Sequence, residues 1–302
     1  MIAIRLRALA LLLIAIPVGA QAPETEPLGR AAYQALVRVE QEPSYATVPF
    51  LMFGLPEHES RNGPLKLLYE ASLAPAFFLF AGKKPWLLAV TPKIVLRQFY
   101  DASEPVPPPS YMPRVTLYYW GAPFAQRRHI DSVVYSFMRV GHHSNGQEEP
   151  FYDSTGAVNV KNGDFYANFL ELGVSKRFFG RGPTIGTQDL SFEWYPAGFM
   201  AKAARPIYGR YRAKAGTRLQ WPGSALGEID GANLQVQYLG GSLAPERRSL
   251  QSRLTLSATV YSDLKHLGDF SPFVGYYTGQ DYYNIRFGRQ ISVLRIGMMT
   301  GR

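Results

Sequence analysis

Residues 130–144 read IDSVVYSFMRVGHHS, and this stretch decides how the rest of the chain is interpreted. Its even positions are mainly apolar, as at Val140, whereas its odd positions include charged residues such as Arg139. Alternation of this kind is typical of a β-strand with one apolar and one polar face. His142 and Ser144 continue the apolar face to the point where the strand ends.

The same alternation recurs along the chain. Residues 207–219 place Arg210, Arg212 and Lys214 on one face and mainly small or apolar residues on the other. A polar face carried by strand after strand suits the wet interior of a barrel better than the dry core of a β-sandwich, which is the alternative. We therefore predict an all-β fold, an antiparallel transmembrane β-barrel of about 12 strands.

Thirteen segments carry strand-like patterns and account for most of the chain after residue 63. Gly, Pro, Asn and Asp separate these segments, and none shows helical periodicity. We predict strands at 65–73, 76–81, 86–100, 114–120, 130–142, 165–179, 188–201, 207–219, 233–239, 253–261, 272–277, 282–287 and 291–298.

The N-terminal residues have the features of an export signal. Two arginines precede an apolar run that is too short to span a bilayer, and small residues at Val18 and Ala20 fit a cleavage site. We predict a signal peptide at 1–20, an N-terminal arm or irregular segment at 21–63 and the barrel at 64–302. The chain has no cysteine and a formal charge of +9. For an exported protein, this charge favours anionic lipid over nucleic acid as a partner.

His142 and Ser144 are two residues apart on one face of the strand. Residues i and i+2 of an extended chain lie about 6.6–7 Å apart, so an imidazole and a hydroxyl at this spacing can reach each other. A histidine within hydrogen-bond reach activates a serine hydroxyl as a nucleophile. Because this face is lipid-compatible, the pair predicts an enzyme whose substrate is the membrane itself.

The sequence His142-His143-Ser144-Asn145-Gly146 resembles the His-x-Ser-Asn-Gly signature of outer-membrane phospholipase A. Residues 114–120, preceded by 110–113, are similar to the strand that leads into the motif in that family. The resemblance implies a twelve-stranded barrel in the bacterial outer membrane. It also implies a triad of His, Ser and an Asn from the following strand.

The alternation of faces along the following strand selects the third member of the triad. In 165–179, Asn168 belongs to the apolar face, and antiparallel neighbours share faces, so Asn168 is expected beside His142. Its amide oxygen could accept the hydrogen of the His142 Nδ1 atom. Asn162 and Asp164 are at even positions, as Asn168 is, and they are the alternative candidates.

The resemblance implies a phospholipase with A1, A2 and lysophospholipase activity. In that reading Ser144 is the nucleophile, His142 the general base and the backbone N–H of Gly146 the oxyanion donor. The family also implies calcium, for which Gln147 and Asp153 are the candidate ligands, and a homodimer. The family's glutamine associated with dimerisation corresponds to Pro92 here, so the resemblance does not carry that dimer contact over to this chain.

Two other functions compete with this interpretation. A lipid A deacylase also uses His-x-Ser on an outer-membrane barrel, but that family has about eight strands and a shorter chain. A non-enzymatic, porin-like barrel would make His142 and Ser144 incidental, and Arg210, Arg212 and Lys214 could then line an anion path.

Overall fold

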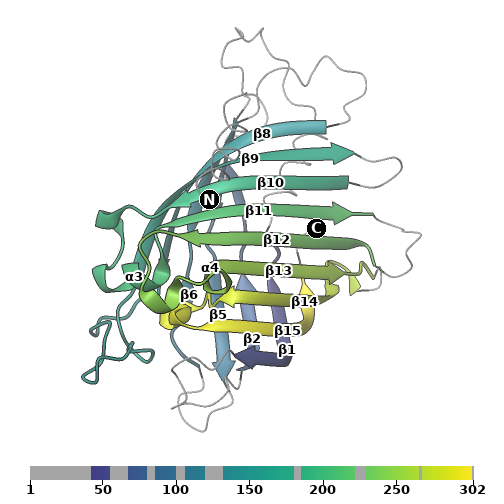
Figure 1. The fold of residues 1–302 in the computed structure, drawn as a ribbon. Helices are drawn as coiled ribbons and strands as arrows, with labels where there is room; N and C mark the ends of the chain where they lie inside the picture. Colours follow the sequence, from purple (N-terminus) through teal and green to yellow (C-terminus); the bar gives the residue numbers. More distant parts are fainter. Residues whose placement is uncertain are drawn as a thin grey trace, which may run out of the picture.

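The computed structural model describes residues 42–54, 67–79, 86–99, 106–119, 132–179, 185–221, 229–264 and 267–300. The predicted signal peptide, 1–20, lies outside these residues. The chain forms a closed antiparallel barrel of 12 strands, which confirms the predicted fold class (Figure 1). The barrel closes because the first described strand, β1 (Tyr45–Gly54), pairs with the last, β15 (Gln290–Met299).

The strands follow one another as a meander. In chain order they are β1 (Tyr45–Gly54), β2 (Leu67–Leu73), β3 (Phe77–Leu79), β4 (Trp86–Thr91), β5 (Ile94–Phe99), β6 (Ser110–Tyr111), β7 (Arg114–Tyr119), β8 (Ser132–Ser144), β9 (Tyr166–Phe179), β10 (Ile185–Trp194), β11 (Tyr211–Gln220), β12 (Gly231–Gly240), β13 (Leu254–Tyr261), β14 (Ser271–Gln280) and β15 (Gln290–Met299).

Three strands of the barrel wall are each interrupted by a break, so that each consists of two shorter strands. The break lies at 74–76 between β2 and β3, at 92–93 between β4 and β5, and at 112–113 between β6 and β7. Each break contains a proline, which has no N–H to give to the sheet. The two pieces on either side of each break continue along the same neighbouring strands.

Two sequence predictions need correction. Strand β1 lies inside the segment 21–63, for which an arm or irregular structure was predicted, and it closes the barrel by pairing with β15. The predicted strand 282–287 is instead largely the 3-10 helix η6 (Asn284–Gly288). Asn284 has a positive φ of 51°, a conformation that an extended strand does not contain.

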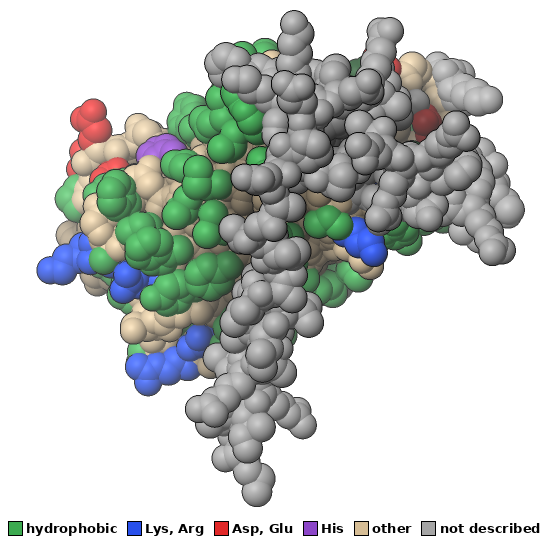
Figure 2. Space-filling view, turned by 90° about the horizontal axis from the view of Figure 1, so that it is seen from above, with side chains coloured by type: hydrophobic (Ala, Val, Ile, Leu, Met, Phe, Trp, Pro, Cys, Tyr) green, Lys and Arg blue, Asp and Glu red, His purple; other side chains and the backbone are tan. Residues whose placement is uncertain are grey.

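The barrel wall has an apolar outside. Large hydrophobic side chains are exposed along successive strands, and Figure 2 shows such side chains gathered over much of the described wall, with charged groups toward its edges. The exposed set includes Val115, Val134, Met138, Val140, Leu172 and Phe192. An apolar outer band is what a strand barrel presents to lipid.

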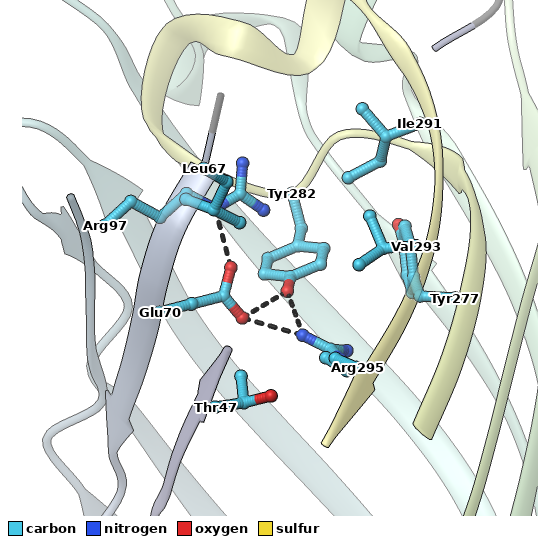
Figure 3. A pocket seen from close by; sticks show the side chains of 9 residues that line it. All are labelled: Thr47, Leu67, Glu70, Arg97, Tyr277, Tyr282, Ile291, Val293 and Arg295. Atoms are coloured by element: carbon cyan, nitrogen blue, oxygen red, sulfur yellow. Dashed lines mark hydrogen bonds and ion pairs between the residues drawn. The ribbon is translucent and has the colours of Figure 1, made fainter. Parts of the chain in front are cut away.

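The inside of the barrel is polar and crossed by ion pairs. Glu171 pairs with Arg139 at 2.7 Å and with Lys214 at 3.2 Å. A second network centres on Glu70, which bonds the guanidinium groups of Arg97 and Arg295 and the hydroxyl of Tyr282 (Figure 3). These contacts pair charged groups of the interior with one another.

Loops with several short helices lie at one end of the barrel, at the left of Figure 1. They contain the short helices η2 (Ala197–Phe199), η3 (Lys202–Ala204), α3 (Arg205–Tyr208), η4 (Pro245–Arg247), α4 (Leu250–Arg253) and η6. Aromatic and aliphatic side chains from these loops form a buried cluster that includes Phe151, Phe165, Tyr208 and Phe287. No helix among the described residues is long and apolar enough to cross a membrane.

Candidate active site

The centre of the candidate site is a contact between two neighbouring strands. His142 on β8 lies directly opposite Asn168 on β9, and the His142 Nδ1 atom is 2.7 Å from the Asn168 Oδ1 atom. His142 is two residues from the exposed Val140, and Asn168 is four residues from the exposed Leu172. Because side chains alternate between the two faces of a strand, both residues belong to the outer face of the wall. The structure thus brings together the two side chains that the sequence analysis placed on the same face of neighbouring strands.

A loop contact fixes the orientation of the Asn168 amide. Its Nδ2 atom donates to the backbone carbonyl oxygen of Phe199, at 3.1 Å. Because a carbonyl can only accept, the amide nitrogen must face Phe199 and Oδ1 must face His142. His142 therefore carries its hydrogen on Nδ1 in this pair, which leaves the Nε2 lone pair available as a base.

Ser144 is the last residue of β8 and lies on the same outer face. It is opposite Tyr111 on one side and Tyr166 on the other, and both tyrosines are more than a third exposed. Within the described residues its hydroxyl makes no hydrogen bond, so the structure does not join it to His142. In enzymes without substrate this contact is often long and tightens when substrate binds.

His143 points to the inside of the barrel, opposite to its two neighbours. It is 5% exposed, and its Nδ1 and Nε2 atoms lie 3.0 Å from the Tyr208 hydroxyl and 3.4 Å from the Ser110 hydroxyl. In the motif His143 is only the variable position between the candidate histidine and the candidate serine. The structure instead gives His143 the role of an internal anchor, which connects the end of β8 to β6 and α3.

Asn145 organises the loop that follows the motif. Its side chain is 2% exposed, donates to the Gly163 carbonyl at 2.7 Å and accepts from the Phe165 N–H at 3.2 Å. Gly146 next to it has a φ of +63°, a conformation that favours glycine. The loop therefore holds the candidate oxyanion donor in a defined conformation.

Asp153, one of the two candidate calcium ligands, lies in a turn that its own side chain stabilises. Asp153 Oδ1 already accepts from the Thr155 N–H at 2.8 Å, the Thr155 hydroxyl at 2.7 Å and the Ala157 N–H at 3.1 Å. These bonds, led by the one from the Thr155 hydroxyl, lower the pKa of Asp153. In the part of the chain that is described, no group of three His, Asp or Glu residues could hold a metal.

The alternative third members lie away from His142. The Asn162 carbonyl accepts from the Glu149 N–H at 3.2 Å, and the Asp164 N–H donates to the Glu149 carbonyl at 2.6 Å. Both residues are therefore part of the loop before β9. Sequence reasoning missed Phe199, because a backbone carbonyl in a distant loop leaves no mark in the sequence.

Comparisons with known proteins support this architecture through structure and not through sequence. No family model and no curated protein matches the sequence. A solved outer membrane phospholipase A from Escherichia coli superimposes with a TM-score of 0.57 and 14% identity, over 86% of this chain and 96% of that one. The chain has the fold of outer membrane phospholipase A.

Two further outer membrane phospholipase A structures are similar over 90% of this chain and 98% of theirs, each with a TM-score of 0.57. One is an active-site asparagine-to-alanine mutant of the E. coli enzyme at pH 6.1, 12% identical to this chain. The other is a Salmonella typhi dimer with bound calcium, 14% identical.

A closed barrel that is apolar outside and polar inside is the architecture of bacterial outer-membrane proteins. This protein is accordingly located in the bacterial outer membrane.

Proposed function

We propose that this protein is an outer-membrane phospholipase that hydrolyses the acyl ester bonds of phospholipids, with A1, A2 and lysophospholipase activity. The observation that carries the proposal is the 2.7 Å contact between His142 Nδ1 and Asn168 Oδ1 on the lipid-facing side of the wall. Ser144 follows two residues later on the same face. A water-soluble substrate would not meet these groups, whereas a membrane lipid would.

The residues have distinct roles in the proposed reaction. Ser144 attacks the ester carbonyl carbon while His142 Nε2 takes the hydroxyl proton. The same imidazole then protonates the leaving lysophospholipid oxygen, and water later hydrolyses the acyl-serine. Asn168 holds the imidazole by accepting from Nδ1, and the Gly146 N–H stabilises the oxyanion.

Likeness to a known enzyme adds support for the asparagine. The E. coli phospholipase structure that carries an active-site asparagine-to-alanine change shows that an asparagine belongs to the active site of that protein. A neutral amide suits a lipid-facing wall, because a carboxylate there would be costly to desolvate. We assign the corresponding role in this chain to Asn168.

Calcium and dimerisation belong to the proposal as properties to be tested. The Salmonella typhi neighbour is a dimer with bound calcium. Asp153 Oδ1 accepts hydrogen bonds within its own turn, and we keep Asp153 and Gln147 as the candidate oxygen donors for calcium. Activity with added calcium and with a chelator, measured beside crosslinking of the purified protein, tests both properties.

The decisive assay measures fatty acid release from phosphatidylethanolamine in detergent micelles. Wild type is expected to release fatty acid, and Ser144→Ala to lower the rate by at least about 1,000-fold. A matched change on the outer face, Val140→Ala, should leave the rate nearly unchanged. If Ser144→Ala retains wild-type activity, Ser144 is not the nucleophile. If only lipopolysaccharide is deacylated, the substrate assignment is wrong.

A further inference from the structure

The three prolines at the strand breaks line up with the candidate site. The registers on either side of the strand breaks place Pro75 opposite Pro92 and Pro92 opposite Pro113. The β7–β8 register, continued by one residue, places Pro113 opposite His142. We name Pro75, Pro92 and Pro113 the proline row; His142 stands at its end.

The proline row leaves a backbone oxygen of His142 without its usual partner. Directly opposite residues in an antiparallel pair exchange both of their N–H···O=C bonds or neither. The His142 N–H donates to the Pro113 carbonyl at 3.0 Å, so the return bond would have to come from the N–H of Pro113. Proline has no N–H, and the His142 carbonyl oxygen therefore lacks a donor in the sheet.

Polar atoms without partners also lie on the inner side of the wall behind the proline row. Ser72 Oγ, Thr91 Oγ1 and Arg114 Nε are buried, and no described group forms a hydrogen bond with any of the three atoms. Thr91 immediately precedes Pro92, and Arg114 immediately follows Pro113. Thr91 and Arg114 are directly opposite each other in the sheet. Buried polar atoms are satisfied by water when no protein group does so.

Charged groups keep this part of the interior polar. The Arg114 guanidinium donates to Glu42 at 2.8 Å, and Lys93 pairs with the same carboxylate. Lys93 immediately follows Pro92, so the ion pairs are directly behind the proline row. The interior can therefore hold water at the position where the wall lacks a backbone hydrogen bond.

We propose that water enters the site from the polar interior, through the wall at Pro113, and that the carbonyl oxygen of His142 holds the water that hydrolyses the acyl-enzyme. One water between Arg114 Nε and the His142 carbonyl would satisfy both unpartnered atoms. This inference rests on the proposed function. It gives a lipid-facing serine hydrolase a supply of water that does not have to cross lipid.

The step balances with water as the only co-reactant. The water oxygen forms a bond to the acyl carbonyl carbon while His142 Nε2 takes one of its protons. The bond between that carbon and Ser144 Oγ then breaks, and the proton returns from Nε2 to Oγ. A fatty acid leaves, and the histidine and the serine regain their starting states.

Pro113→Ala tests the proposal because alanine restores the N–H that would occupy the His142 carbonyl. In the full-length protein with a phospholipid substrate, rapid quenching followed by mass spectrometry measures acylation and deacylation of Ser144 separately. We expect deacylation to fall about tenfold, and the acyl-enzyme to accumulate, while acylation changes by less than about twofold. Pro75→Ala makes the same chemical change at the far end of the proline row and should leave both rates as in wild type.

A second variant keeps the test open if Pro113→Ala does not fold. Thr91→Val is nearly isosteric and removes one polar partner of the interior water, so it should also slow deacylation selectively. Equal loss of both rates, or no loss in either variant that folds, would overturn the inference and leave the phospholipase assignment standing. A wild type that forms no acyl-enzyme on Ser144 would instead overturn the proposed function.

Discussion

Asn168 is the residue whose contacts define the candidate site. Its amide joins two groups that do not otherwise meet, the His142 imidazole and the Phe199 carbonyl. Replacing Asn168 with alanine removes both contacts, so we expect kcat for phospholipid hydrolysis to fall by about 100-fold. Circular dichroism and heat-dependent gel mobility should remain those of a folded barrel.

Asn168→Asp separates the two contacts. A carboxylate can still accept from His142 Nδ1, but its second oxygen faces the Phe199 carbonyl, and two acceptors repel each other. We expect activity between that of wild type and that of Asn168→Ala. Activity of Asn168→Asp at or above the wild-type level would show that the Phe199 contact has no part in positioning the amide.

Tyr208 tests the role of the inward histidine. Its hydroxyl is the buried partner of His143, and Tyr208→Phe removes that hydrogen bond while it keeps the ring in the aromatic cluster. We expect a loss of about 1 kcal/mol in the free energy of unfolding, with kcat little changed. Urea unfolding in detergent, monitored by tryptophan fluorescence, measures this loss. A large loss of kcat without loss of stability would instead place His143 in the reaction.

At the scale of elements, the loop after β8 depends on one side chain. Asn145 ties its start to Gly163 and Phe165 at its end. Asn145→Ala leaves these backbone groups without a partner, which typically costs about 1–3 kcal/mol. We expect faster proteolytic cleavage within 146–162 and lower activity, because Gly146 loses its fixed position. Glu148→Ala, a change of an exposed side chain in the same loop, is the matched control.

Strand alternation predicted most of the wall, and the exceptions have physical causes. The alternation of apolar and polar residues along 130–144 and 165–179 was sufficient to place Asn168 beside His142, because the side-chain period of a strand is two residues. Strand β1 was missed because YATVPFLMFG contains a proline and an apolar run without clear alternation. The segment 282–287 is rich in aromatic residues as strands are, but Asp281 and Asn284 bond nearby backbone N–H groups and favour a turn.

At the scale of the whole molecule, the closed barrel leaves its outer face to lipid and pairs buried charges with one another inside. Arg97 is 1% exposed and bonds both Glu70 and Asp281. Arg97→Met would leave two buried carboxylates without their shared partner, which typically costs about 3–5 kcal/mol. We expect a large fall in the urea midpoint, whereas the exposed Lys202→Met should change it little. Equal midpoints for the two variants would contradict the importance of this network.

The central claim is that Ser144 is an activated nucleophile on the lipid-facing side of the wall. The most direct measurement is covalent labelling of the micelle-embedded protein with a long-chain fluorophosphonate, followed by peptide mass spectrometry. We predict one adduct, on Ser144, that is lost in His142→Ala and strongly reduced in Asn168→Ala. No adduct on Ser144, or labelling of Ser144 that persists without His142, would contradict the claim.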